Sequence, residues 1–202
     1  MADNRKITSI ELQQKRKERF SIFLDDEFAF GVHRDTLLKA GVAKGDDLTE
    51  KQIHEIQDLE NLRAAKEKGL RLLAVRPRSS KELRDRLKQT RYSPETIEKV
   101  LEEFDRLGLL NDVEFGKMYA RSQMITKPMG QFLLRRELKF KGLKEDEIQQ
   151  AVDVAYSEES EKQIAFDLAA RRKKRVENLE EMKAKKRVSD FLQRRGFNWE
   201  II

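Results

Sequence analysis

The first part of the chain alternates hydrophobic and polar positions in three short runs. ITSIELQ, FSIFL and EFAFGV each place branched or aromatic residues at alternate positions. Alternation of this kind is typical of a β-strand with one buried face. The pattern predicts a two- or three-stranded antiparallel sheet over about residues 6–32, and so small a sheet needs a helix to pack against it.

The alternation also assigns side chains to faces of this sheet, because every second residue of a strand points the same way. It groups Phe20 with Ile22 and Leu24, and Phe28 with Phe30 and Val32. Between these runs, Asp25 and Asp26 tolerate a left-handed backbone and predict a tight hairpin turn. The next segment, RDTLLKAG, predicts a short helix that stops at Gly41.

Beyond the sheet, hydrophobic residues recur at helical spacing. Thr49 and Gln52 form the pattern of a capping box at the start of a helix. This helix is expected to bend or break at Gly69 and to end at Pro77.

Three later stretches share one pattern: SSKELRDRLKQTRYSPETI, QFLLRRELKFKGLKEDEI and KKRVSDFLQRRGFNWEII. They align on Leu87, Leu138 and Leu192, which lie 51 and 54 residues apart. Hydrophobic residues coincide four residues before, five after and ten after this leucine. These sets are Leu83, Leu134 and Val188; Tyr92, Leu143 and Phe197; and Ile97, Ile148 and Ile202. A fixed period of this size indicates tandem repeats.

Each repeat is expected to contain three short helices. The anchor leucine and the residue four before it share one helix face. A tight turn follows, in which Gly142 and Gly196 suit a left-handed residue and Arg91 suits it less well. Ser93 is a good cap for the helix after the turn, and the segment preceding each stretch supplies another helix.

The predicted fold is mainly α: an elongated, curved array of tandem three-helix repeats with a small N-terminal antiparallel β-sheet. The expected divisions are a β-rich segment with a short helix over 1–46, and repeats over 47–111, 112–158 and 159–202. The third repeat ends where its last helix should begin, so we expect it to be incomplete and the chain to be a truncated form.

Charge is distributed in blocks along the chain. The 202 residues carry a net charge of +6, and 40% of them are charged. Net charge is −3 over residues 1–60, +5 over 61–111, −1 over 112–160 and +5 over 161–202. Basic blocks attract phosphates or acidic protein surfaces, although a charge run is more often a solvated helix face laced with ion pairs.

No catalytic pattern emerges, so we expect a protein that is not an enzyme and needs no cofactor. The sequence has no phosphate-binding glycine loop and no nucleophile elbow. With no cysteine, thiolate metal sites are excluded, and His33 and His54 lack metal-ligand spacing. The missing cysteines, signal peptide and membrane-length apolar run favour a cytoplasmic protein without membrane contact.

The candidate interface residues are therefore basic. Arginine suits forked contacts to phosphate or carboxylate, and the scarcity of aromatic neighbours argues against base stacking and for sequence-independent backbone contacts. The candidates are Arg71, Arg76, Arg78, Arg84, Arg86, Arg121, Arg135, Arg136, Lys139, Lys141, Arg171, Arg172, Lys173, Lys174, Arg175, Lys185, Lys186, Arg187, Arg194 and Arg195.

The sequence resembles the RecX family, the regulators of the RecA recombinase. RPRSSKELRDRLKQ, YSPETIEKVLEEFDRLGLLND, EFGKMYARSQ and MGQFLLRRELKFKGL carry the resemblance, and the β-rich start is similar to members from low-GC Gram-positive bacteria. The resemblance implies a regulator of DNA repair and recombination. Such a protein binds the groove of the RecA–DNA filament and inhibits its growth, ATPase and strand exchange. We further expect a monomer that contacts the backbone of single- or double-stranded DNA. The alternative is a general helical DNA-binding protein without RecA specificity.

Overall fold

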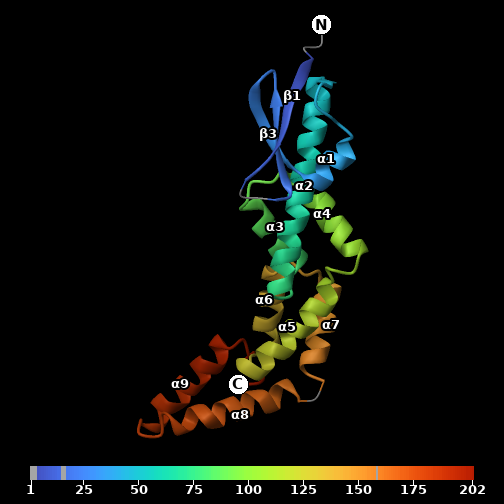
Figure 1. Ribbon diagram of the computed structural model, residues 1–202. Helices are drawn as coiled ribbons and strands as arrows, with labels where there is room; N and C mark the ends of the chain where they lie inside the picture. Colours follow the sequence, from blue (N-terminus) through green and yellow to red (C-terminus); the bar gives the residue numbers. More distant parts are fainter. Residues whose placement is uncertain (1–3, 15–16, 158) are drawn as a thin grey trace. The chain divides into compact units, whose positions relative to one another are not determined.

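The computed structural model describes residues 4–14, 17–157 and 159–202, which contain four strands and nine helices (Figure 1). Their order is β1 (Arg5–Leu12), β2 (Arg19–Leu24), β3 (Glu27–His33), α1 (Arg34–Ala40), β4 (Asp47–Leu48), α2 (Glu50–Val75), α3 (Ser80–Lys88), α4 (Pro94–Arg106), α5 (Asp112–Thr126), α6 (Gln131–Phe140), α7 (Glu145–Ala155), α8 (Glu161–Lys174) and α9 (Glu181–Arg194). The predicted fold class, mainly helical with a small N-terminal sheet, is confirmed.

The chain divides into two compact units. The first unit comprises the residues up to Val75 together with Arg84–Phe104, and the second comprises Arg76–Leu83 together with Asp105–Ile202. The finer division into one β-rich segment and three repeats, with the boundaries given above, stays a prediction.

The sheet of the first unit is antiparallel with the strand order β3-β2-β1-β4. Two or three strands were expected, and the two-residue β4 is too short for alternation to reveal. Asp25 and Asp26 have φ angles of 51° and 68°, which confirms the left-handed turn between β2 and β3. The Asp25 carboxylate accepts a hydrogen bond from the Lys6 N–H at 3.0 Å and so ties this turn to β1.

One facial assignment in this sheet is wrong. Phe28 was grouped with Phe30 and Val32, but it pairs with Phe23 and its side chain is 61% exposed. The cause is a β-bulge, since Phe30 still pairs with Ile22 and the register shifts at the next position. A bulge inserts one residue, and side chains beyond it change face.

Helices α1 and α2 pack against the sheet of the first unit (Figure 1). The core between them contains Ile7, Ile22, Leu24, Val32, Leu48, Ile53 and Ile56. The predicted stop of α1 is confirmed, because Gly41 is its left-handed C-cap with φ 64°. This packing supplies the helix cover that a small sheet requires.

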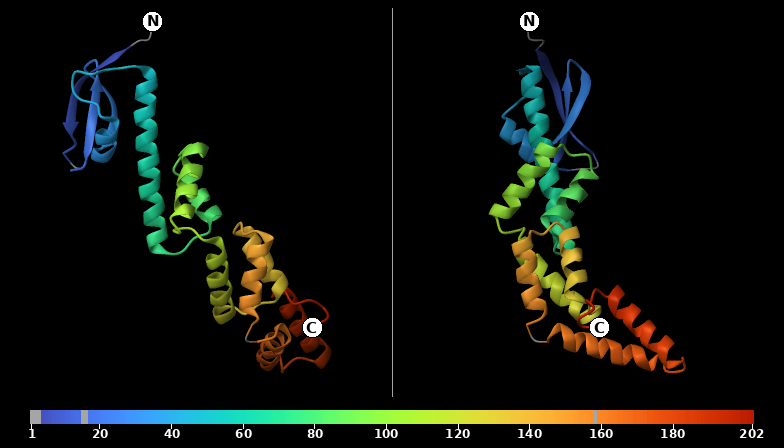
Figure 2. Two further views of the ribbon diagram at one scale, coloured as in Figure 1. Left: turned by 90° about the vertical axis from the view of Figure 1, so that its right-hand side faces the viewer. Right: turned by 180° about the vertical axis from the view of Figure 1, so that it is seen from behind.

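Helix α2 begins as predicted but does not break at its glycine. The Thr49 N–H donates to the Gln52 side chain at 2.9 Å, and the Gln52 N–H donates back to Thr49 at 3.3 Å, which confirms the capping box. The helix continues through Gly69 and ends at Val75, and Figure 2 shows α2 as one unbroken helix. A Cβ at Gly69 would lie 2.7 Å from Phe104, so the glycine permits close packing against α4 instead of a bend.

The repeat register is confirmed by burial. The anchors Leu87 and Leu138 are fully buried and Leu192 is 3% exposed. The residues after them turn through left-handed backbone in every repeat, at Arg91 (φ 64°), Gly142 (φ 91°) and Gly196 (φ 84°). Arg91 therefore adopts a left-handed backbone, although residues with a side chain beyond Cβ rarely do so and glycine was expected to suit this position better.

Within the second unit, consecutive repeats meet at equivalent positions of the repeat. The Ser79 hydroxyl, eight residues before one anchor leucine, donates to the carbonyl of Lys141 at 2.7 Å. The Gly130 N–H, eight residues before the next anchor, donates to the carbonyl of Arg195 at 2.8 Å. Lys141 and Arg195 both follow their anchor by three residues. We call these two contacts the repeat junctions.

Helices α8 and α9 form an antiparallel hairpin at the C-terminal part of the second unit (Figure 2). Its core contains Ile164, Ala165, Leu192 and Phe197. Ser160 caps α8 by accepting a hydrogen bond from the Gln163 N–H at 3.3 Å. Two helices and a closing turn are therefore present in the described residues of this repeat.

Candidate partner and nucleic-acid interface

Several of the predicted interface cations already have carboxylate partners. These pairs are Arg71 with Glu67 (3.3 Å), Arg76 with Glu82 (2.8 Å), Arg84 with Glu98 (2.8 Å), Arg135 with Glu145 (3.1 Å), Lys141 with Glu82 (2.8 Å) and Lys185 with Glu181 (2.7 Å). Pairs at exposed positions contribute little to stability and can exchange for a partner's charge. Burial therefore decides which of these cations remain available.

Lys141 and Arg195 are held in the repeat junctions. The Lys141 ammonium lies 4.6 Å from the centre of the Tyr119 ring, and its side chain is 20% exposed. Arg195 donates to the carbonyl of Pro128 at 3.0 Å and lies 5.3 Å from the centre of the Phe191 ring. Both predicted candidates thus have structural roles at equivalent positions.

The carboxylate of Glu82 stays charged at the first junction despite its partial burial. Burial by itself would raise the pKa of Glu82, but hydrogen bonds from Arg76 and Lys141 outweigh it and hold the pKa below its usual value. The carboxylate thereby connects α3 to the end of α6 within the second unit.

The densest group of exposed cations lies where α8 and α9 meet. The last turn of α8 carries one basic run and the first turns of α9 carry the other, and the short connection between the helices places both at one end of the hairpin (Figure 1). We call this surface the basic hairpin. It consists of Arg171, Arg172, Lys173, Lys174, Arg175, Lys183, Lys185, Lys186 and Arg187.

Most cations of the basic hairpin face solvent. Lys183 and Lys185 pair with Glu180 and Glu181, and these pairs are at least 66% exposed on both sides. Arg172 differs, because it is half-buried and lies 5.4 Å from the centre of the Phe191 ring. The negative end of the α8 dipole favours cations in its last turn. Such a surface can neutralise several phosphates of a nucleic-acid backbone.

The remaining predicted cations lie just before α3, on α3, α5 and α6, and at the end of α9. Arg78 is half-buried and already engaged by other groups of the protein, and Arg86 donates to Gln89 at 3.1 Å. The others are exposed and form no ion pair with any residue that the structure describes: Arg121, Arg136, Lys139 and Arg194. Arg136 and Lys139 share α6, whereas Arg121 lies on α5 and Arg194 at the end of α9.

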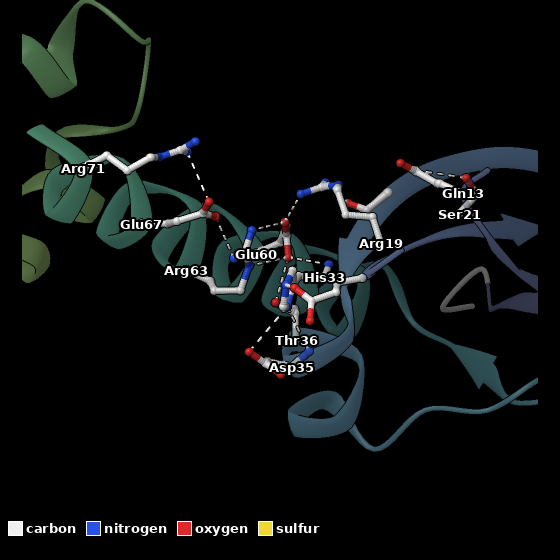
Figure 3. A network of polar contacts seen from close by, with 12 residues as sticks. Gln13, Arg19, Ser21, His33, Asp35, Thr36, Glu60, Arg63, Glu67 and Arg71 are labelled. Atoms are coloured by element: carbon white, nitrogen blue, oxygen red, sulfur yellow. Dashed lines mark hydrogen bonds and ion pairs between the residues drawn. The ribbon is translucent and has the colours of Figure 1, made fainter. Parts of the chain in front are cut away.

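The first unit contains a polar network that the sequence analysis missed (Figure 3). Its centre is Glu60 on α2, whose side chain is 10% exposed. The carboxylate accepts hydrogen bonds from Arg19 at 2.7 Å, from the Thr36 hydroxyl at 2.7 Å and from the His33 N–H at 2.9 Å. Arg63, one turn further along α2, also contacts Glu60 at 3.3 Å and Glu67 at 3.0 Å.

The charge of Glu60 is maintained by these partners. Burial raises its pKa, but the hydrogen bonds from His33, Arg63 and Thr36 together lower it below its usual value. A signal for this group was present in the sequence, because Glu60 follows Ile53 and Ile56 on the buried face of α2 at helical spacing. A charged residue at such a position needs buried partners.

A hollow of about 1060 Å³ lies beside this network in the first unit. Lys17, Arg19, Arg63, Glu67, Arg71 and Tyr92 contribute to its lining. Among the described residues, no group of three or more His, Cys, Asp or Glu side chains could hold a metal ion. In the same part of the chain, no helix has the length and apolarity needed to span a membrane.

Comparison with known protein families accounts for the order of the N-terminal sheet and the helical repeats along the chain. Four sequence models match consecutive parts of the chain: Regulatory protein RecX N-terminal domain over 5–49, and the first, second and third three-helix domains of RecX over 65–104, 111–152 and 159–202. The chain belongs to the RecX family. The resemblance drawn from the sequence motifs is thus confirmed.

Individual RecX relatives agree along nearly the full chain. Regulatory protein RecX from Bacillus subtilis is 36% identical over 196 residues, which cover 97% of this chain and 74% of the relative. Regulatory protein RecX from Listeria welshimeri is 34% identical over 196 residues, covering 97% and 72%. Both are named as regulatory proteins, and the present chain shares that regulatory family.

Solved RecX structures also share the fold. A crystal structure of regulatory protein RecX superposes with a TM-score of 0.75 at 28% identity, covering 98% of this chain and 96% of that one. RecX from Lactobacillus salivarius gives a TM-score of 0.62 at 20% identity over 70% of this chain and 91% of that one. The second similarity concerns the fold alone.

Proposed function

We propose that this protein is a non-enzymatic regulator of DNA repair and recombination that binds the RecA nucleoprotein filament. In this proposal it inhibits filament growth, the RecA ATPase and strand exchange, and it acts as a cytoplasmic monomer. The observation that carries the proposal is the match to RecX domains along nearly the whole chain. Several repeats suit a repeating partner, since contacts that are weak singly gain effective concentration when they are linked.

The basic hairpin is the surface that we assign to the polyanionic side of the filament. Its exposed lysines and arginines suit phosphates or acidic side chains. Arg136 and Lys139 on α6 offer additional exposed cations. Lys141 and Arg195 are better explained by the repeat junctions, so we leave them out of the proposed contact surface.

A second candidate function is general DNA binding without RecA specificity. The same basic hairpin favours it, because sequence-independent binding needs little more than clustered cations and an accessible backbone. The two functions differ in whether RecA-dependent inhibition requires binding to bare DNA.

The test uses RecA assembled on single-stranded DNA, with its DNA-dependent ATPase and filament disassembly as readouts. The protein is added in stoichiometric excess, as wild type and as a variant with Lys173→Gln, Lys174→Gln, Lys186→Gln and Arg187→Gln. A matched variant removes the same charge elsewhere: Lys39→Gln, Lys44→Gln, Lys51→Gln and Lys99→Gln, all exposed positions.

Inhibition by wild type and by the matched variant is the expected result. If the hairpin variant no longer binds bare DNA yet still inhibits RecA, the filament regulator is favoured over the general DNA-binding protein. If DNA binding and inhibition are lost in the same proportion, general DNA binding is favoured. An unchanged ATPase rate in the presence of excess wild-type protein would overturn the proposed function.

A further inference from the structure

The hollow of the first unit has a lining rich in hydrogen-bond donors. Lys17 is exposed and forms no ion pair with the described residues, and Arg71 is 68% exposed. Arg19 and Arg63 lie deeper, at 23% and 22% exposure, where Glu60 fixes their positions. The two deeper arginines thus form a rigid floor, and Lys17 and Arg71 are the cations available to meet a ligand.

Two carboxylates, Glu18 and Glu67, also line the hollow, and their ion pairs determine which cations can accept an anionic ligand. Glu67 is bound by Arg63 at 3.0 Å and by Arg71 at 3.3 Å. Glu18 lies 3.4 Å from the His33 ring and 3.5 Å from Arg34. An incoming anion can replace Glu67 at Arg71, because this pair is exposed and weak, whereas Glu67 keeps its ion pair with Arg63.

Tyr92 adds an aromatic side chain to this cationic lining. It was expected only as a hydrophobic repeat position, but it is half-buried and belongs to the hollow. Its hydroxyl forms no hydrogen bond with the described residues, and burial raises the pKa of Tyr92. An aromatic face beside arginine and lysine is the combination that single-stranded nucleic acids bind without sequence preference.

We propose that this hollow binds single-stranded nucleic acid, with backbone phosphates at Lys17 and Arg71 and a base against Tyr92. A volume of about 1060 Å³ exceeds what one phosphate needs and suits a short stretch of strand. An acidic peptide is a poorer occupant, because it makes no use of the aromatic ring of Tyr92. What goes beyond the proposed function is the site itself, because the hollow lies in the first unit, whereas the proposed phosphate contacts were assigned to the basic hairpin of the second unit.

The experiment is an NMR titration of the ¹⁵N-labelled full chain, which reads each region separately. The amides of Ala64, Glu67, Arg71 and Tyr92 report on the hollow, and those of α8 and α9 report on the basic hairpin. The probes are an eight-nucleotide oligothymidylate, thymidine monophosphate, inorganic phosphate and an eight-residue polyglutamate, all at low salt.

The oligothymidylate should shift the hollow amides at concentrations where thymidine monophosphate and inorganic phosphate leave them in place. In the Lys17→Gln, Arg71→Gln variant, the affinity read at these amides should fall about 25-fold at 0.1 M salt. Its salt slope should be shallower by about 1.4, because two phosphates are no longer neutralised. Lys39→Gln, Lys44→Gln removes the same charge outside the hollow and should change neither quantity.

Tyr92 variants separate the ring from the hydroxyl. Tyr92→Phe should keep the affinity within about twofold, because the stacking face remains. Tyr92→Leu should weaken binding at least about fivefold, because the aromatic face is removed.

Three outcomes would overturn the site. In the first, the oligothymidylate shifts only the amide signals of α8 and α9 and leaves those of the hollow unchanged. In the second, inorganic phosphate shifts the hollow amide signals as effectively as the oligothymidylate. In the third, polyglutamate at equal charge shifts the hollow amide signals as effectively as the oligothymidylate. None of these results bears on RecA inhibition, so the proposed function can stand or fall separately.

Discussion

The Glu60 network of the first unit and the basic hairpin of the second unit both contain several basic side chains, but these are buried and paired in the network and exposed in the hairpin. Around Glu60, Arg19 and Arg63 are about four-fifths buried and are fixed by a carboxylate, a carbonyl and neighbouring side chains. In the basic hairpin, every lysine and arginine except Arg172 is exposed, and their few ion pairs are exposed.

The difference shows that the role of a basic residue in this protein follows from its burial. A desolvated cation is costly unless it is paired, and so it becomes part of the architecture. An exposed cation contributes little to folding and is available to a partner. Lys141 and Arg195 belong with the Glu60 network in this respect, although they lie in the second unit.

The largest expected effect comes from removing the centre of the network. Glu60→Ala leaves Arg19 and Arg63 without their shared partner, which should lower the free energy of unfolding by about 3–5 kcal/mol. Urea denaturation followed by circular dichroism measures the change. Glu55→Ala, at an exposed position on the same helix whose ion pair is 3.9 Å long, should cost less than about 0.5 kcal/mol. Equal losses for both variants would refute the distinction between buried and exposed charges.

A smaller effect is expected at the first repeat junction. Lys141→Ala removes both the partner of Glu82 and the cation over the Tyr119 ring, which should cost about 2 kcal/mol. The same denaturation experiment applies. Lys139→Ala, an exposed neighbour on α6, is the control. If the two variants have the same stability, Lys141 has no junction role and returns to the interface candidates.

The loss of stability at acidic pH should depend on Glu60 and Glu82, the carboxylates of the network and of the first repeat junction. Folding lowers the pKa of Glu60 and of Glu82, so the unfolded chain binds their protons first as pH falls. Their stabilisation is complete above the unfolded glutamate pKa of about 4.3 and is lost below it. Between about pH 5 and 3, Glu60→Gln should therefore lose less stability than wild type. A parallel decline of the two proteins would contradict the assigned direction.

These comparisons also show what the sequence could predict. Hydrophobic period and capping patterns located β1, β2 and β3, the start of α2 and the three anchor leucines, because each depends on residues near one another in the chain. The bulge that exposes Phe28 and the packing of Gly69 on Phe104 depend on residues that come together only in the fold.

The candidate site was predicted less well for the same reason. Clusters of lysine and arginine are visible in the sequence, and the basic hairpin was among them. Charge counting could not separate Lys141 and Arg195 from the exposed cations, since their partners lie 59 and 67 residues away. The Glu60 network joins β2, α1 and α2, and only the position of Glu60 on an apolar helix face hinted at it.

The smallest effect on stability is expected in the basic hairpin. The variant with Lys173→Gln, Lys174→Gln, Lys186→Gln and Arg187→Gln should unfold within about 0.5 kcal/mol of wild type, because these side chains are exposed. Thermal melting checks this expectation. A large loss of stability would mean that the hairpin cations are structural and would remove them from the proposed contact surface.

The most direct test of the account is the concentration of this protein that halves the DNA-dependent ATPase rate of RecA. Wild type should reach that point near stoichiometry with RecA. The hairpin variant should need more protein, but by a smaller factor than the one by which its affinity for bare DNA falls, because the other repeats keep their contacts to the filament. RecA activity that stays unchanged at every concentration of wild-type protein would contradict the account.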